Sequence, residues 1–226
     1  MKLYRFFKEK PYTLLSAYWF IQILWYQIAL KVSIFGNEVI MIPFNSIDNL
    51  IPFCEWFIIP YVLWYPFILC VNVYLARKGE KQEYMYLALM TIIGMVICMG
   101  GNTIFPTEII RDENLIENLG RSNILTKFTA FIYSCDDPPR LVFPSMHVYG
   151  SVVLAAAMLK CKAAKLWMNI ASVTLSVLIC LSTMFIKQHS VIDFASALLL
   201  FTVLHIGYII VLKIKNRKSL QEKGVR

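Results

Sequence analysis

The feature that most constrains the fold of this chain is a series of long segments without a single charged side chain. Six segments contain no Asp, Glu, Lys or Arg: residues 11–30, 56–76, 84–107, 141–159, 166–186 and 194–212. A helix needs about 20 apolar residues to cross roughly 30 Å of hydrocarbon. Only helices and closed barrels satisfy their backbone in lipid, and the sequence lacks the alternating pattern of a barrel. We therefore predict an all-α fold, a polytopic membrane bundle of six transmembrane helices.

Composition agrees with this prediction. Hydrophobic residues make up 58% of the 226 residues and charged residues only 16%, a balance that is unusual for a soluble domain. The sequence has no tandem repeat, no low-complexity tract and no linker between soluble domains. We expect a single membrane domain over residues 1–226.

The net charge of +8 comes from basic residues at alternate ends of the apolar segments. Most of the 22 Lys and Arg residues lie in segments 2–10, 77–81, 160–165 and 213–226. With six crossings all four segments are on one side, which the positive-inside rule makes the cytoplasm. We predict cytoplasmic termini, a basic cytoplasmic tail at 213–226, a plasma-membrane location and no nucleic-acid partner. The first apolar run lacks a small-residue cleavage site, so we expect a retained span rather than a signal peptide.

The longest hydrophilic connection, residues 108–140, falls on the opposite, extracytoplasmic side. Within it, "NILTKFTAFIYS" places Ile124, Phe128 and Phe131 close to one helical stripe, which predicts a helix on the membrane surface. Two functions are open for this helix, a gate for lipid entry and a simple cover. The following "DDPPR" ends it, because two prolines remove backbone donors.

Three clusters of polar residues are predicted to meet on this extracytoplasmic face. They are "PTEIIRDEN" with Arg111, "FPSMHVYGS" with Ser145 and His147, and "LSTMFIKQHSVID" with Lys187, His189 and Asp193. Each cluster alone can be explained by hydrogen bonding at a membrane interface. Together they supply the complementary parts of a phosphate site. His205, alone in the last apolar run without an evident partner, is interpreted as structural.

The second and third clusters indicate how such a site would work. Proline and Ser145 suit the start of a helix, where unpaired N–H groups bind an anion, and His147 brings a proton donor to the same turn. His189 and Asp193 are four residues apart, so on a helix they share one face. A carboxylate that holds one ring nitrogen leaves the other as a base or nucleophile.

These motifs resemble those of the type 2 phosphatidic acid phosphatase superfamily, which includes lipid phosphatases and lipid head-group phosphotransferases. The resemblance rests on "FPSMH", and on "ST" followed by five residues, His189, three residues and Asp193. The segments "IDNLIPFCEWFIIPYVLWYP" and "IYSCDDPPRLVFPSMHV" are similar to the branch related to inositol phosphorylceramide synthases. The resemblance extends from Asp48 to the end of the last apolar run.

The resemblance implies a reaction. His189 would attack phosphorus and become a transient phosphohistidine, with Asp193 orienting the ring. His147 would protonate the leaving oxygen and then activate water or an alcohol. Neither a metal nor another cofactor is required, because cationic side chains and a helix N-terminus supply the electrostatic stabilisation.

The resemblance also implies a phosphate cradle. Arg111, Ser145 and the backbone around Met146 would hold the phosphate oxygens. The first motif departs from the family pattern, because Ile104 stands where a lysine is usual and Asp112 where a proline is usual.

The third motif departs as well, since Thr183 stands where the family usually has arginine. Lys187 is a candidate replacement, because it shares a face with Thr183 if the helix continues through both residues. A lysine that extends to water is the alternative. Arg140 is a second candidate phosphate ligand.

The leading hypothesis is a membrane enzyme that hydrolyses a lipid phosphate monoester or pyrophosphate. The runner-up is a head-group phosphotransferase, similar to the inositol phosphorylceramide synthases, that uses the same site with an alcohol in place of water. A transporter or channel, a metal site built from His147, His189 and Asp193, and a lipid-binding pseudoenzyme are further alternatives.

Overall fold

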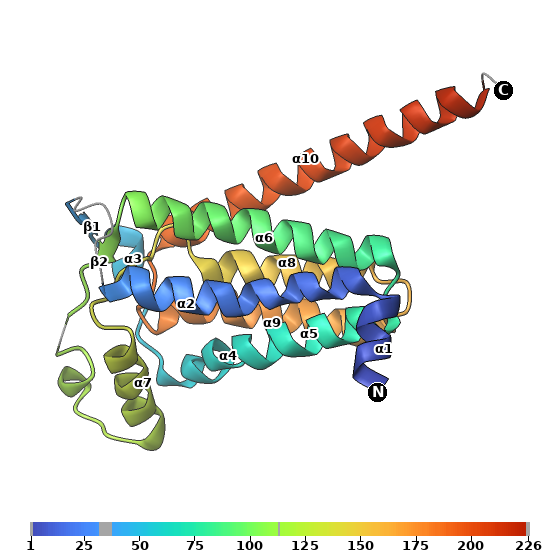
Figure 1. Ribbon diagram of the computed structural model, residues 1–226. Coiled ribbons are helices and arrows are strands. Elements are labelled where there is room, and N and C mark those ends of the chain that lie inside the picture. The colour runs from blue at the N-terminus through green and yellow to red at the C-terminus, as the bar shows by residue number, and fades with distance from the viewer. Residues whose placement is uncertain (1, 32–37, 113, 225–226) are drawn as a thin grey trace.

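The computed structural model describes residues 2–31, 38–112 and 114–224, and within them the protein is nearly all helical (Figure 1). Its α-helices are α1 (Lys2–Glu9), α2 (Tyr18–Lys31), α3 (Ser46–Leu50), α4 (Ile58–Val62), α5 (Trp64–Lys78), α6 (Lys81–Ile104), α7 (Ile124–Cys135), α8 (Met146–Lys160), α9 (Leu166–Phe185) and α10 (Val191–Gly224). The 3-10 helices are η1 (Pro11–Ala17), η2 (Glu55–Phe57) and η3 (Glu117–Leu119), and the strands are β1 (Ile40–Ile42) and β2 (Thr107–Ile109).

Five helical segments are long and apolar enough to cross a membrane. In the described part of the chain they are Pro11–Leu30, Glu55–Lys78, Lys81–Ile104, Leu166–Phe185 and Val191–Lys218. They correspond to five of the six predicted crossings and indicate a helical membrane protein.

The fourth apolar run, residues 141–159, forms a shorter helix. α8 has only 15 residues, because Leu141 takes a positive φ of 60° and the helix is capped at Ser145. At 1.5 Å per residue α8 is about 22 Å long, less than the roughly 30 Å of hydrocarbon. The predicted count of six full-length spans is therefore not confirmed.

The second apolar run is divided into η2, α4 and α5 in succession. Pro60 and Pro66 each occupy the third position of their helix, α4 and α5. In a first turn the backbone N–H has no partner within the helix, so a proline there costs no hydrogen bond. The prolines thus mark new helix starts within one continuous crossing.

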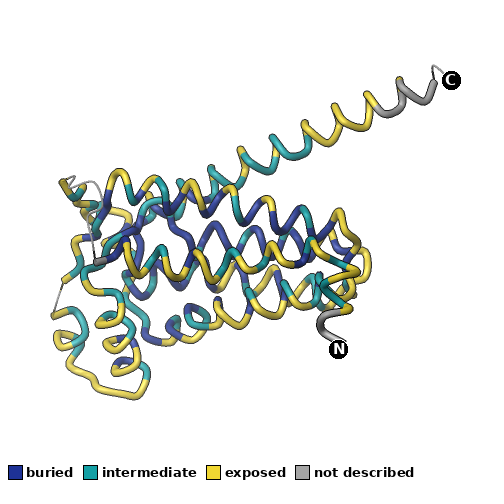
Figure 2. The backbone as a smooth tube through the Cα atoms, viewed as in Figure 1, coloured by how far each residue is buried: buried dark blue, intermediate teal, exposed yellow. Residues whose placement is uncertain are grey.

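The core of the bundle is organised around α8, which packs against α5, α6, α9 and α10. Figure 2 shows its tube largely in the buried colour. Tyr149 of α8 is fully buried, and its hydroxyl donates to the carbonyl of Met90 on α6 at 2.6 Å. Gly94 lies directly against this ring, since a Cβ atom at Gly94 would be 1.9 Å from Cζ of Tyr149. The close contact of α6 and α8 therefore requires glycine here.

The substitution Gly94→Ala is expected to destabilise the protein, because the added methyl group overlaps a buried ring. Overpacking of this kind costs about 1–3 kcal/mol. Gly101→Ala on the same helix is the matched control, as a Cβ there meets nothing within 4 Å. Thermal unfolding in detergent should show a lower melting temperature for the Gly94 variant only. Equal melting temperatures would contradict the packing described here.

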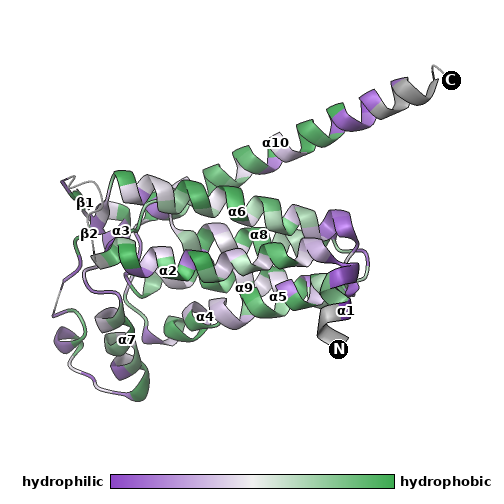
Figure 3. Ribbon diagram, viewed as in Figure 1, coloured by the Kyte–Doolittle hydropathy of each residue, from purple (hydrophilic) through white to green (hydrophobic). Residues whose placement is uncertain are grey.

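The two ends of the bundle differ in character. Figure 1 shows both termini directed toward one end, which also carries the α5–α6 and α8–α9 connections. Figure 3 shows hydrophilic residues at this end, and also in the loops of the opposite end. The basic segments 2–10, 77–81 and 160–165 thus lie at one end of the bundle. Residues 213–224 of the predicted tail continue α10 as helix, and α10 extends away from the other helices.

His205 has a partner, contrary to the expectation that it stands alone. Its Nδ1 atom lies 2.7 Å from the hydroxyl of Tyr86 on α6, and its ring stacks on Phe201 at 5.3 Å between centroids. The hydrogen bond links α10 to α6 within the membrane span. The structural interpretation of His205 agrees with this contact.

The opposite end carries the irregular segments. β1 and β2 pair in parallel, with Ile40 opposite Thr107. α7 packs on η2 and α4, and the carboxylate of buried Glu55 accepts hydrogen bonds from Arg121 at 2.7 Å and from Asn123 at 3.0 Å. The other face of α7 leaves Phe131 exposed. α7 is therefore anchored by polar contacts on one side and apolar on the other.

Candidate functional site

The structure brings the second and third polar clusters together at the end of the bundle that carries α7. His147 lies in the first turn of α8, His189 in the α9–α10 connection and Asp193 in the first turn of α10. The rings of His147 and His189 are 6.1 Å apart between centroids. The backbone N–H of Ser145 donates to the carbonyl of Asp193 at 3.4 Å, which ties the starts of α8 and α10 to each other.

His189 and Asp193 form the pair predicted from their spacing. The Nδ1 atom of His189 lies 3.5 Å from Oδ2 of Asp193, whose side chain is fully buried. The same oxygen accepts the backbone N–H of Ser190 at 2.9 Å, and the backbone N–H of His189 donates to the carbonyl of Thr183 at 3.0 Å. The carboxylate of Asp193 and the backbone of His189 are thus held in place where α9 turns into α10.

His147 is enclosed by aromatic rings. Tyr61 stacks on it at 4.4 Å and Trp64 contacts it at 4.3 Å between centroids. The hydroxyl oxygen of Ser145 caps α8 by accepting the N–H of Val148 at 3.4 Å. These contacts fix the direction of the imidazole at a helix N-terminus, where backbone N–H groups favour an anion.

Buried polar atoms without a hydrogen-bond partner concentrate in this region. The described residues contain nine such side-chain atoms, and four of them are His147 Nε2, Gln188 Nε2, His189 Nδ1 and Asp193 Oδ1. A buried polar group left unsatisfied costs about 1–3 kcal/mol. His189 Nδ1 lies beside the Asp193 carboxylate, so His147 Nε2 and Gln188 Nε2 are the atoms of this group that a polar ligand could satisfy.

Arg111, from the first cluster, reaches the same region. Its Nη1 atom donates to Oε1 of Gln188 at 3.3 Å. Its guanidinium carbon lies 3.5 Å from the ring centroid of Tyr133, which belongs to α7. The hydroxyl of Tyr133 in turn donates to the carbonyl of Ile186. The three predicted clusters therefore meet, and α7 contributes a residue to them.

Lys187 does not share a helical face with Thr183 as expected. α9 ends at Phe185, and Lys187 has a positive φ of 54°. Its ammonium group donates to the backbone carbonyls of Asp48, at 2.6 Å, and Ile51 at the end of α3. Burial lowers the pKa of Lys187 below its usual value, against the opposing effect of Asp48. The prediction that Lys187 binds phosphate required one helix to continue through Thr183 and Lys187, and the helix ends between them.

Arg140 is also engaged. Its Nε atom donates to Oε2 of Glu108 at 3.0 Å, in a pair that is about three quarters buried. The two residues are bridged through their backbones as well, beside β2. The charge of Arg140 is therefore already balanced by a carboxylate.

Asp136 is a residue of this region that sequence reasoning did not select. It caps the end of α7, accepts a hydrogen bond from the hydroxyl of Tyr26, and lines a cavity together with His147. Burial raises the pKa of Asp136 to about 6, although Tyr26, His189 and Arg111 act to lower it. Its position beside two prolines suggested only a helix end, and no local pattern signalled that it would face His147.

The cavity that Asp136 and His147 line has a volume of about 900 Å³. It runs between η1–α2 and α4–α5, which lie alongside each other in Figure 1. The lining positions of α5 recur every three or four residues as far as Arg77, so one face of that helix forms its wall. His189 does not line it. The cavity is largely apolar, and at one end it is lined by Asp136 and His147.

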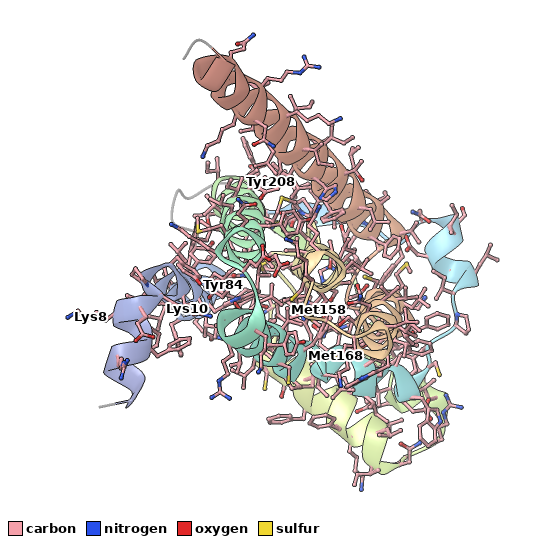
Figure 4. All side chains as sticks on the ribbon, turned by 90° about the vertical axis from the view of Figure 1, so that its right-hand side faces the viewer. Lys8, Lys10, Tyr84, Met158, Met168 and Tyr208 are labelled. Atoms are coloured by element: carbon pink, nitrogen blue, oxygen red, sulfur yellow. The ribbon has the colours of Figure 1, made fainter. Side chains whose placement is uncertain are left out.

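The far end of the cavity lies at the end of the bundle that carries the basic segments. Figure 4 views this end and labels Lys10 and Tyr84. Tyr84 lines the cavity, and the ammonium group of Lys10 donates to the carbonyl of Ala76 at 2.9 Å. Between Tyr61 and Arg77 the wall is about 24 Å long at 1.5 Å per helical residue. The cavity thus follows most of the length of the bundle.

Comparison with known proteins adds no assignment. Protein-family models, curated proteins and solved structures were searched, and none matches this chain. Among the described residues, no three or more His, Cys, Asp or Glu side chains are grouped as a metal site.

The raised pKa of Asp136 predicts a pH-dependent stability. Because the folded-state pKa of about 6 exceeds the ordinary value of 3.8, the stabilising contribution is complete below about pH 4 and is lost as pH rises through 6. Asp136→Asn cannot ionise and should not show this loss. Melting temperatures measured from pH 4 to pH 7 should fall for the wild type relative to the variant. Parallel curves would contradict the buried state of this carboxyl group.

Proposed function

We propose that this protein is an integral membrane lipid phosphatase that hydrolyses a lipid phosphate monoester or pyrophosphate through a phosphohistidine intermediate. The observation that carries the proposal is the meeting of His147, the His189–Asp193 pair and Arg111, beside a long apolar cavity that His147 also lines. The polar groups suit a phosphate, and the cavity suits a hydrocarbon chain. Resemblance to the type 2 phosphatidic acid phosphatases supports the same conclusion.

The proposed topology has both termini in the cytoplasm and the site on the extracytoplasmic side of the plasma membrane. α8 is the fourth of six crossings in this proposal, and its first turn lies below the outer membrane surface. Its short length supports this placement, because α6 has 24 residues and α8 only 15. A lipid head group would then meet His147 at the depth where its own chain begins.

The first half of the reaction transfers the phosphoryl group to the enzyme. With Nδ1 of His189 directed at Asp193, Nε2 attacks phosphorus and a P–N bond forms as the bond to the leaving oxygen breaks. The proton of the leaving group comes from His147, and Arg111 binds the non-bridging oxygens. Asp193 stabilises the positive charge that develops on the ring of His189.

The second half releases phosphate. Water attacks phosphorus and gives its proton to His147, and the P–N bond breaks so that His189 recovers its electron pair. An alcohol in place of water would give a phosphodiester and make the protein a head-group phosphotransferase. Asp136, which lines the cavity together with His147, is a candidate acceptor for a hydrogen bond from the attacking hydroxyl, whether of water or of an alcohol.

The test is a panel of lipid phosphates and pyrophosphates given to the purified protein, with and without alcohol acceptors. Inorganic phosphate is expected from the wild type. His189→Ala should abolish turnover, and His147→Ala should reduce it by about 100-fold or more, the usual contribution of a general acid–base. His205→Ala, the third histidine, should retain turnover.

Unchanged turnover in His189→Ala would refute the covalent mechanism. A new phosphodiester lipid without release of phosphate would instead identify the transferase. Exhaustive chelation that removes all activity would support the metal-site alternative.

The cavity predicts that chain binding can be weakened without affecting the chemistry. Val73→Trp on the cavity wall should fill part of its far end, and Cys70→Trp on the exposed lipid side of α5 is the matched control. Excluding two methylene groups costs about 1.6 kcal/mol at 0.8 each, or roughly tenfold in affinity. The KM for a long-chain lipid phosphate should rise about tenfold in the Val73 variant alone. Turnover of a water-soluble phosphate ester should stay unchanged, and an equal loss for both substrates would contradict the assignment.

A further inference from the structure

Arg111 carries an unusual share of the positive charge in this site. Ile104 and Thr183 replace the two other cations of the family pattern. Lys187 donates to the carbonyls at the end of α3, and Arg140 pairs with Glu108. Arg111, by contrast, contacts an amide oxygen and an aromatic ring, and within residues 2–31, 38–112 and 114–224 it is the candidate cation paired with neither a carboxylate nor a backbone carbonyl. A single guanidinium must be well oriented to replace several cations.

Two contacts orient it. The ring of Tyr133 lies 3.5 Å from the guanidinium carbon, a cation–π distance, and Oε1 of Gln188 accepts from Nη1 at 3.3 Å. Gln188 uses one of the five N–H donors of the guanidinium, so donors remain for phosphate oxygens. The aromatic face sets the plane of the group, and the amide sets its rotation within that plane.

Both partners of Arg111 are themselves fixed. The hydroxyl of Tyr133 donates to the carbonyl of Ile186, and α7 is anchored by the contacts of Arg121 and Asn123 with Glu55. The backbone N–H of Gln188 donates to the carbonyl of Thr183 at 2.9 Å, and its side chain is only 2% exposed. The Nε2 atom of Gln188 is buried and unpartnered, next in sequence to His189.

We propose that Tyr133 and Gln188 are positioning residues that hold Arg111 in the orientation that binds a phosphoryl group. α7 is then a structural part of the phosphate site, in addition to the predicted functions of a cover or a gate for lipid entry. The inference rests on the proposed function for the identity of the ligand as a phosphate. It goes beyond that function because it gives a role in phosphate binding to Tyr133, which lies outside the three motifs, and to Gln188, a position that the third motif leaves unassigned.

The experiment measures phosphate affinity and turnover in the full-length protein in detergent. Inorganic phosphate and orthovanadate serve as probes in calorimetry, and kcat and KM are measured with the best lipid phosphate. Tyr133→Leu removes the ring and Gln188→Leu removes the acceptor. Tyr133→Phe keeps the ring, and Phe131→Leu changes an exposed residue of the same helix.

Tyr133→Leu and Gln188→Leu should each weaken binding of both probes and raise KM by about five- to tenfold, with a smaller change in kcat. Tyr133→Phe, which keeps the ring but loses the hydrogen bond to Ile186, should recover most of the affinity lost in Tyr133→Leu. Phe131→Leu should stay within about twofold of the wild type. In an Arg111→Lys background, which lacks the planar group, the Tyr133→Leu effect should nearly disappear.

Unchanged probe affinity in Tyr133→Leu and Gln188→Leu would overturn the proposal. An undiminished Tyr133→Leu effect in the Arg111→Lys background would also overturn it, since the ring would then act through the packing of α7. Should Tyr133→Leu not fold, the effect of Gln188→Leu is compared in the wild-type and Arg111→Lys backgrounds instead. An undiminished effect in the Arg111→Lys background would again overturn the proposal.

The two proposals fail in different ways. Probe binding that depends on Tyr133 and Gln188, without turnover of any lipid phosphate, would reject the enzyme and retain the positioning role. Turnover with no effect of either residue on KM or probe affinity would retain the enzyme and reject the positioning role. A wild-type protein that binds neither probe would overturn the inference.

Discussion

The first turn of α8 is the constraint on which the arrangement of the other elements depends. Helical backbone in lipid must satisfy its own polar groups, and a helix N-terminus leaves N–H groups without partners. In this protein that N-terminus begins at Met146, after a non-helical segment, in a helix of only 15 residues. Ser145 satisfies one N–H, and the start of α10 is tied to the same point through Asp193. A polar pocket inside a membrane bundle is the consequence.

Aromatic contacts surround one side of this turn, and polar contacts lie on the other. Tyr61 and Trp64 enclose His147, and the largely apolar cavity leads away from it along α5. On the other side, Arg111 is held by Tyr133 and Gln188. A charged group at a membrane interface is costly unless paired or hydrogen-bonded. The surrounding contacts therefore explain how this arginine is kept in place.

Much of this arrangement followed from the sequence. The charge-free runs predicted the membrane helices, and the spacing of His189 and Asp193 predicted a pair that the structure forms at 3.5 Å. Other expectations did not hold. The helical relation of Lys187 to Thr183 fails because α9 ends two residues before Lys187. Asp136 was missed because its role depends on Tyr26, which is distant in sequence and adjacent in space.

The sequence by itself determined that this chain forms membrane helices, where these helices approximately begin and end, and which residue types are available for chemistry. These properties are local, since hydrophobicity and i, i+4 spacing act within one segment. Only the tertiary structure decided which cations are free. Lys187 and Arg140 were both candidates in the sequence, and each is engaged by a partner from a distant segment, the carbonyls of Asp48 and Ile51 for Lys187 and Glu108 for Arg140. Such competition depends on how loops pack against one another, which no single segment encodes.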